Sequence, residues 1–417
     1  MESIIPSRKL DDYVLGPMLG KGFFGHVRIA TRVDNTNVKY AIKYMKIGKP
    51  HSKENLLQML QQEATLQIIR HPNILQVYSI NSEGYYEKYY PEVKRIPVVY
   101  AVMQLAQGGD LFDFLTSTGA LSEDMARFFF IKILNTIEYL HYSGIAHRDI
   151  KLENILLDQD FNPLLTDFGL SRKLSEIGFV TNNPSHRVGT ERTMSPELLG
   201  NGFHSAIKDD LFALGYLLFM MVARHPPFLS TGINNEHYRL LRENRVLEYW
   251  KDVDSVHSSK WCSDNFKHLI TIMLAFNMTV RLSTAEIRAH PWMQGSIPSE
   301  AEVKYEFQQR QVTALECQIK QAQARKKRKD EIQKNENAQK KRFGPHKSNR
   351  SMTLQGSGEG ISQTRGKRIR IKDFGEPTKR KPTIFISGES VEDIAIALIS
   401  FFSSAKSIKI NQSEHKV

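Results

Sequence analysis

The stretch His147-Arg148-Asp149-Ile150-Lys151-Leu152-Glu153-Asn154, followed thirteen residues later by Asp167-Phe168-Gly169, decides the fold of this chain. Asp149 offers a carboxylate that can orient a hydroxyl group and accept its proton. Lys151 places a positive charge two residues away, where it can neutralise a phosphate. Asn154 and Asp167 offer oxygen ligands of the kind that Mg²⁺ prefers. These residue types at this spacing predict a site for a hydroxyl, a phosphate and a metal ion.

The composition predicts a globular protein with a tail. The length of 417 residues is enough for one large or two ordinary domains with a tail, and the 41% of residues that are hydrophobic are enough for a substantial core. The only cysteines are Cys262 and Cys317, which argues against a disulfide scaffold and for a reducing compartment. Residues 1–6 lack the apolar run of a signal peptide, and no stretch approaches the roughly 18 apolar residues of a membrane span. We therefore expect a soluble protein of the cytoplasm, the nucleus or both.

The positive charge is concentrated in the tail. The net charge is +12, but residues 1–293 carry 32 Lys+Arg and 31 Asp+Glu, whereas residues 294–417 carry 25 and 14. The tail has few aromatic residues among its cations, so it is poorly suited to stacking on bases. We expect no nucleic-acid function beyond salt-sensitive, sequence-independent contacts.

A glycine-rich stretch lies near the N-terminus. Residues 13–47 alternate apolar and polar in short runs, which predicts twisted antiparallel strands. Within them stands Gly20-Lys21-Gly22-Phe23-Phe24-Gly25-His26-Val27, whose glycines would let the backbone approach phosphates closely. Such a motif alone also fits a dinucleotide fold. Here, however, Ala41-Ile42-Lys43 follows, and not the acidic residue expected about 20 residues further on.

Together these motifs resemble eukaryotic protein kinases over residues 10–293. Lysine two residues after Asp149 resembles the serine/threonine kinases, and the surrounding sequence is similar to the calcium/calmodulin-dependent and AMP-activated kinase group. The resemblance implies an α+β, bilobal fold: a small antiparallel β-sheet lobe with one helix (10–105) and a large, mainly helical lobe (106–293). It also implies phosphorylation of protein substrates on serine or threonine with ATP and Mg²⁺, for which Mn²⁺ could substitute.

The resemblance assigns roles to individual residues. Asp149 would align the substrate hydroxyl, Lys151 would stabilise the transferred group, and Asp167 and Asn154 would bind the metal ions. Lys43 would hold the inner phosphates. The implied nucleotide site takes its residues from the glycine-rich loop, the next strand, the helix over residues 53–70, the adenine-binding hinge (104–106) and the strand after the catalytic loop (147–154). These residues are Leu19, Gly20, Lys21, Gly22, Phe23, Phe24, Gly25, His26, Val27, Ala41, Lys43, Glu63, Met103, Gln104, Leu105, Ala106 and Leu156.

One position departs from the kinase pattern. A kinase places a glutamate on the helix over residues 53–70 to pair with the strand lysine, here Lys43. Counting back from His71 puts Gln62 at this position, whereas a helix one residue shorter puts Glu63 there. We take Glu63 as the partner. The neutral amide of Gln62 would hold the lysine more weakly, and a pseudokinase that only binds nucleotide or partners is the corresponding alternative.

The segment after Gly169 resembles an activation loop (170–189) that closes with Gly189-Thr190-Glu191-Arg192-Thr193-Met194-Ser195-Pro196-Glu197, in which Ser195 replaces the usual alanine. The resemblance implies further roles around it: Thr190 at the substrate hydroxyl, Asp110 and Glu153 facing basic substrate residues, Asp210 bracing the catalytic loop, Glu197 tied to Arg281, and Arg148 pairing with a loop phosphate, for which Ser185 is favoured over Thr181. An upstream kinase would add that phosphate. A loop that orders without phosphate is the alternative.

The remaining segments carry weaker signals. Residues 81–97 read as a surface extension of a hairpin, and a long apolar helix should run from Ser122 to near Gly144. Residues 300–343 predict a charged helix, which we expect to be solvated. The alternatives are a nuclear-import signal or a patch for anionic surfaces, and an inhibitory or calmodulin-binding helix. Residues 344–383 have the composition of a disordered basic linker, and residues 384–417 form a short apolar segment.

Overall fold

The structure is a computed structural model that describes residues 8–21, 25–48, 53–57, 69–89, 94–178, 181–183, 187–200, 202–257 and 260–342. The chain divides into two compact units, and the boundary lies inside the C-terminal helix, after Ala314. The first unit contains everything described up to that residue. The predicted linker (344–383) and apolar C-terminal segment (384–417) lie outside the described residues.

The first lobe is a six-stranded antiparallel sheet. Its strands are β1 (Arg8–Leu10), β2 (Tyr13–Lys21), β3 (His26–Arg32), β4 (Lys39–Lys46), β5 (Val77–Lys88) and β6 (Lys94–Gln104), in the order β1-β2-β3-β4-β6-β5. The predicted antiparallel strands over residues 13–47 are thus confirmed. Residues 53–57, at the start of the predicted helix over 53–70, are helical, and residues 58–68 lie outside the description.

Residues 81–97 extend the hairpin between β5 and β6, as predicted, but Tyr86 within this extension is buried and does not lie on the surface. Lys88 of β5 still pairs with Lys94 of β6, and β1 pairs with the same end of β5. Gly84 is required here because a Cβ atom would lie 2.4 Å from the ring of Tyr100. A second small core of mainly tyrosine and aliphatic side chains, which includes Tyr86, fills this end of the sheet.

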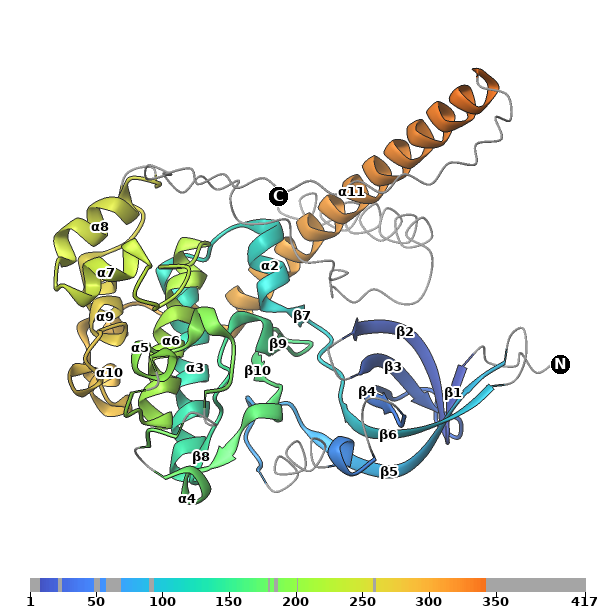
Figure 1. The fold of residues 1–417 in the computed structure, drawn as a ribbon, viewed down its shortest axis with the longest axis horizontal. Helices are drawn as coiled ribbons and strands as arrows, with labels where there is room; N and C mark the ends of the chain where they lie inside the picture. Colours follow the sequence, from blue (N-terminus) through green and yellow to red (C-terminus); the bar gives the residue numbers. More distant parts are fainter. Residues whose placement is uncertain are drawn as a thin grey trace, which may run out of the picture. The chain divides into compact units, whose positions relative to one another are not determined.

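The second lobe is mainly helical and is built around two long helices that are largely buried (Figure 1). Its helices are α2 (Leu111–Thr118), α3 (Glu123–Tyr142), α4 (Leu174–Ile177), α5 (Pro196–Leu199), α6 (Ala206–Ala223), α7 (Glu236–Arg242), α8 (Val246–Asp254), α9 (Asp264–Met273) and α10 (Thr284–Ala289), with short 3₁₀ turns between some of them. Ser122 caps α3, so the predicted long helix begins where expected. The bilobal kinase fold predicted from the motifs is confirmed.

Short strands carry the catalytic loop and its neighbours between these helices. They are β7 (Gly109–Asp110), β8 (Ile145–Ala146), β9 (Ile155–Leu157), β10 (Pro163–Leu165) and β11 (Arg172–Lys173). β9 pairs with β7 and β10, and β8 pairs with β11. One hydrophobic core runs through both lobes and includes Ala41 and Met103 of the first and Phe168 of the second.

The C-terminal helix α11 (Glu300–Arg342) packs on the second lobe with its first turns. Phe307 is 0% exposed, and its ring centroid lies 5.2, 5.1 and 5.6 Å from those of Phe114, Phe129 and Phe161. The prediction of a solvated helix is therefore wrong for these turns, because they carry an apolar face that the second lobe buries. In the described part of the chain, no helix has the length and apolar character that crossing a membrane requires.

Candidate active site

Asp149 is held in a hydrogen-bonded triangle with Lys151 and Thr190. Lys151 Nζ donates to Asp149 Oδ2 over 2.6 Å and to Thr190 Oγ1 over 2.7 Å, and Thr190 Oγ1 donates to Asp149 Oδ1 over 2.8 Å. Burial opposes ionisation of Asp149, but the charge and hydrogen bond of Lys151 outweigh it, so the pKa of Asp149 lies below its ordinary value. The carboxylate is therefore ionised at neutral pH and fixed in orientation, as alignment of a hydroxyl requires.

Asn154 is fixed by the same aspartate. Its Nδ2 donates to the backbone carbonyl of Asp149 over 2.7 Å and to Asp149 Oδ2 over 3.1 Å. Its own backbone carbonyl accepts a hydrogen bond from Thr166 N, just before Asp167. Since the amide nitrogen of Asn154 is committed to Asp149, its Oδ1 is the side-chain atom left to bind a metal ion.

Asp167 has a strained backbone that its surroundings hold. Its φ angle is 62°, in the left-handed region. The next side chain, Phe168, is buried and lies edge-on to the ring of His147, with 4.7 Å between ring centroids. Strain of this kind persists only where packing enforces it. The packing of Phe168 on His147 thus restrains the backbone directly next to Asp167.

The carboxylate of Asp210 braces the backbone of the catalytic loop, as predicted. Its Oδ2 accepts from the backbone N–H of His147 and its Oδ1 from that of Arg148, over 2.9 and 2.8 Å. His141 Nε2 lies 2.9 Å from the same Oδ2. Burial opposes ionisation, but the hydrogen bond and charge of His141 outweigh it, so the pKa of Asp210 lies below its ordinary value. His141 was not anticipated from the sequence, where it is one of several polar residues in an apolar helix.

The residues predicted to bind metal would suit an ion that is shared with a nucleotide. They supply one carboxylate, Asp167, and one amide oxygen, Asn154. Among the residues that the structure describes, no cluster of three or more His, Cys, Asp or Glu side chains could hold a metal by itself. Mg²⁺ is commonly bound by one or two carboxylates together with substrate phosphates. The donor set therefore fits a divalent ion that is bound together with phosphate oxygens.

The apolar residues of the predicted nucleotide site, which would form a slot for adenine, lie together at the edge of the main core. Ala41 and Met103 are buried and pair directly across β4 and β6. The partly buried members pack against the same cluster: Leu19, Val27, Leu105 and Leu156. An apolar edge that is only partly covered is the surface that a planar base would bury.

The hinge can offer adenine only some of its backbone groups. The N–H of Gln104 donates to the carbonyl of Gln76 over 2.8 Å, and Gln104 Oε1 accepts from Gln76 N over 3.2 Å. Because that N–H is occupied, a hinge N–H for adenine must come from Leu105 or Ala106. The sequence had not distinguished among these three residues.

Lys43 lies on the same face of β4 as the slot. It stands two residues after Ala41, and side chains at this spacing share a face of a strand. Its cross-strand partners are Val27 and Ala101. Glu63 and the alternative Gln62 lie outside the described residues, so the partner of Lys43 on the helix stays a prediction.

The glycine-rich loop is only partly described, because Gly22, Phe23, Phe24 and the side chain of Lys21 lie outside the description. A Cβ atom at Gly25 would lie 2.6 Å from the carbonyl oxygen of Tyr44, whereas at Gly20 it would meet nothing within 4 Å. His26 stacks on Tyr44 with 5.5 Å between ring centroids. Close strand packing thus explains Gly25, and the requirement for glycine at Gly20 is not steric in this structure.

Of the two carboxylates assigned to substrate recognition, Asp110 is buried. It caps α2, where its Oδ1 accepts from Phe112 N over 2.7 Å and from Asp113 N over 3.3 Å, and it is 6% exposed. Burial, followed by the charge of Asp113, raises the pKa of Asp110 to about 8. Glu153 is partly exposed. Recognition of basic residues stays a prediction for both, and Glu153 is the more accessible of the two.

The long-range tie between Glu197 and Arg281 is present. Arg281 Nη1 and Nη2 donate to Glu197 Oε1 and Oε2 over 2.5 and 2.6 Å, and Arg281 is buried. A bidentate pair of this kind fixes the end of the activation segment (residues 170–197) against the last helices. The predicted phosphorylation site Ser185 lies outside the described residues.

The comparisons with known proteins agree with this geometry. The protein kinase domain family matches residues 13–293. The chain therefore belongs to the protein kinase family. It is 32% identical over 294 residues to serine/threonine-protein kinase SRK2B of Arabidopsis thaliana. The match covers 70% of this chain and 74% of the relative.

Two further relatives belong to the same broad group. The chain is 27% identical to CBL-interacting protein kinase 31 of Oryza sativa subsp. japonica, over 72% of this chain and 61% of the relative. It is 30% identical to the SNF1-related protein kinase catalytic subunit alpha KIN12 of Arabidopsis thaliana, over 69% of this chain and 53% of the relative. The chain thus spans between half and three quarters of these relatives. All three are named protein kinases, and SRK2B is named a serine/threonine-protein kinase, in agreement with the predicted resemblance to the AMP-activated kinase-like group.

Proposed function

We propose that this protein transfers the γ-phosphoryl group of ATP to serine and threonine hydroxyls of protein substrates, with Mg²⁺ as the divalent ion. The observation that supports this most directly is the triangle of Asp149, Lys151 and Thr190, because it joins an ionised carboxylate to a cation and a hydroxyl. A divalent ion, when bound, would supply charge that neutralises the nucleotide phosphates.

The residues of the chain divide the remaining work. Asp149 aligns the attacking hydroxyl and accepts its proton as the new oxygen–phosphorus bond forms. The bond between the γ-phosphorus and the β–γ bridging oxygen breaks, and ADP leaves. Lys151 stabilises the negative charge on the transferred group, and Asn154 and Asp167 provide the oxygens for the metal ion. Lys43 holds the inner phosphates from the opposite lobe.

The test is a phosphorylation assay on the full chain with labelled ATP, Mg²⁺ and matched peptides that carry either arginine or a neutral residue upstream of one serine. We expect labelling, and Asp149→Ala should lower the rate by about 10²–10⁴-fold. The exposed Asp12→Ala serves as a matched control and should leave the rate unchanged. Purified protein that binds ATP with Mg²⁺ but labels no serine or threonine would support the pseudokinase alternative.

The same assay examines substrate preference. We propose that Glu153 favours basic residues upstream of the target hydroxyl, since its carboxylate is partly exposed beside the catalytic loop. The arginine peptide should be the better substrate, and Glu153→Gln should reduce this preference without abolishing labelling of the neutral peptide. Equal labelling of both peptides by the unaltered protein would exclude a basic preference.

A further inference from the structure

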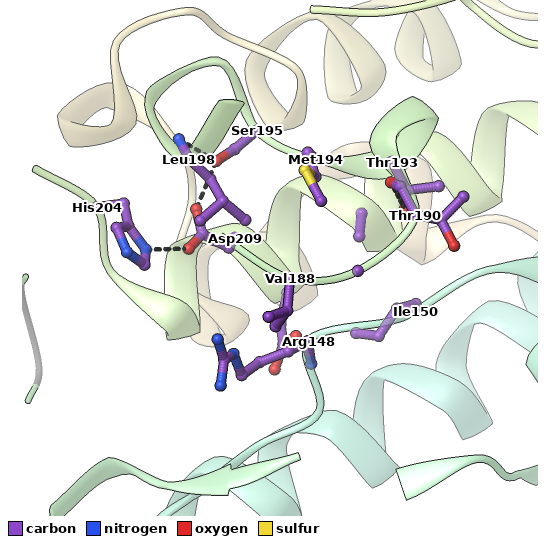
Figure 2. A pocket seen from close by; sticks show the side chains of 13 residues that line it. Arg148, Ile150, Val188, Thr190, Thr193, Met194, Ser195, Leu198, His204 and Asp209 are labelled. Atoms are coloured by element: carbon purple, nitrogen blue, oxygen red, sulfur yellow. Dashed lines mark hydrogen bonds and ion pairs between the residues drawn. The ribbon is translucent and has the colours of Figure 1, made fainter. Parts of the chain in front are cut away.

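Three buried polar side chains form a network beside the catalytic loop. Ser195 Oγ donates to Asp209 Oδ1 over 2.5 Å, and His204 Nδ1 lies 2.7 Å from Asp209 Oδ2 (Figure 2). All three residues are less than 9% exposed. Each carboxylate oxygen thus has its own partner, as a buried carboxyl group requires. The network lines a small pocket whose wall also contains Arg148 and Thr190.

The members come from three different segments. Ser195 lies near the end of the activation segment and caps α5, where its Oγ accepts from Leu198 N. His204 lies in the connection between α5 and α6, and Asp209 lies in the first turn of α6. The backbone of His204 also pairs with Thr181 of the activation segment, through hydrogen bonds of 2.8 and 2.9 Å in the two directions. Two separate parts of the activation segment are therefore connected to Asp209.

Asp209 is covalently next to Asp210, which holds the backbone of His147 and Arg148. Asp209 lies in the first turn of α6 and Asp210 follows it directly, in a helix that is buried along most of its length. The position of the activation segment is thus set relative to the catalytic loop through one rigid turn. Between Gly189 and Ser195 this segment carries Thr190, whose hydroxyl contacts Asp149.

The network depends on side chains that the kinase resemblance did not assign. An alanine at position 195, which is usual in the motif, could not donate to Asp209. An aspartate at position 209 without such a donor would leave a buried carboxylate oxygen unpaired, which is costly. Ser195 and Asp209 therefore form a matched pair, and His204 completes the set of hydrogen bonds.

We propose that Ser195, Asp209 and His204 are positioning residues that hold the Thr190-bearing end of the activation segment against α6 and, through it, against the catalytic loop. This rests on the proposed function for its kinetic readout. Since the nucleotide site is built from other elements, loss of the network should weaken the use of protein substrate and leave the use of ATP unchanged.

The experiment compares the full chain with Ser195→Ala, Asp209→Ala and the double variant, using steady-state kinetics for the peptide and for ATP. Ser195→Ala should raise the KM for the peptide about tenfold, the equivalent of one buried hydrogen bond to a carboxylate, with the KM for ATP within about twofold. In the Asp209→Ala background, Ser195→Ala should have little further effect, because the two residues act as a pair.

Ser230→Ala is the matched control. Ser230 Oγ accepts a hydrogen bond from Gly232 N in a nearby loop but does not contact the network. This variant should leave both KM values unchanged. Asp209→Asn, which is similar in shape and can still accept from Ser195, should retain more activity than Asp209→Ala. If Asp209→Ala does not fold, Ser195→Ala alone still tests the proposal.

Hydrogen exchange gives a readout that does not need activity. The amides of residues 187–200 should exchange faster in Ser195→Ala than in the unaltered chain, while those of α3 should not change. If neither the unaltered chain nor Ser195→Ala phosphorylates the peptide, but exchange changes as expected, the proposed function is wrong and the positioning role of the network still holds. Unchanged exchange and an unchanged peptide KM would overturn the proposal, as would a parallel rise in both KM values.

Discussion

At the scale of single residues, two carboxylates near the catalytic loop have opposite electrostatic surroundings. Asp149 has the ammonium group of Lys151 at 2.6 Å, which favours its charged form. Asp110 is buried and has backbone N–H donors but also the nearby charges of Asp113 and Glu153, so its neutral form is favoured. The same residue type is therefore a carboxylate of lowered pKa in one place and a helix cap of raised pKa in the other.

The raised pKa of Asp110 predicts a pH-dependent stability. Between its ordinary pKa of 3.8 and the folded value of about 8, the folded state keeps a proton that the unfolded chain releases. The contribution of Asp110 to the free energy of unfolding therefore falls as the pH rises through this window. Asp110→Asn keeps a good helix cap but does not titrate. Its stability relative to the unaltered protein, measured by urea unfolding, should increase from pH 5 to pH 8. A constant difference between the two proteins across this range would contradict the raised pKa.

At the scale of elements, the first turns of α11 act as part of the second lobe. Phe307 completes a cluster of four phenylalanines with Phe114 of α2, Phe129 of α3 and Phe161 of the turn between β9 and β10. Polar contacts surround this cluster. Arg310 donates to Thr118 Oγ1 and to the carbonyls of Gly119 and Ala120 at the end of α2. Phe161 itself has φ +62°, a backbone conformation that an aromatic residue adopts only when packing holds it.

Truncation of this aromatic cluster should be strongly destabilising. Phe307→Ala removes a fully buried ring, and such changes cost about 3–5 kcal/mol of the free energy of unfolding. Tyr305→Ala is the matched control on the same helix, since Tyr305 is 65% exposed, and should change stability by no more than about 0.5 kcal/mol. Denaturant unfolding of the full-length variants measures both. Similar losses for the two substitutions would show that the burial of Phe307 contributes nothing specific.

At the scale of the whole molecule, the catalytic unit is longer than the family match. The family covers residues 13–293, but Val303 and Phe307 belong to the same hydrophobic cluster as residues of the catalytic lobe. The first compact unit accordingly extends to Ala314 before the boundary within α11. The first compact unit therefore ends 21 residues beyond the end of the family match.

Two shortened chains test this difference. A chain of residues 1–314 should unfold close to the temperature of the full chain and phosphorylate peptides comparably. A chain of residues 1–293 should unfold at a temperature lower by roughly 5–15 °C, because loss of several kcal/mol shifts the midpoint by this order in a domain of this size. Thermal unfolding followed by circular dichroism measures both. If the two shortened chains unfold together, residues 300–314 do not belong to the core.

The sequence by itself determined the family, the catalytic loop and the strands and helices with strong periodicity. Motifs such as those around Asp149 and Asp167 are readable because phosphate and metal chemistry demands particular residue types at fixed spacing. The tie between Glu197 and Arg281 was predicted from the family resemblance, which has a motif at each end of this pair. At Gln62 and Glu63 the sequence departs from the kinase pattern. A shift of one residue in the end of the helix changes which of the two would pair with Lys43, and periodicity does not place a helix end to within one residue.

Only the tertiary structure decided the contacts that no motif encodes. The pairing of Ser195 with Asp209 and His204 joins three segments that the sequence shows as unrelated polar residues. The burial of Phe307 depends on three other phenylalanines that lie up to 193 positions away along the chain, so its helix reads as charged and solvated until the packing is seen. The physical reason is common to both: a hydrogen bond or a buried ring gains its stabilising effect from partners in space, and local periodicity carries no information about which distant segment supplies them.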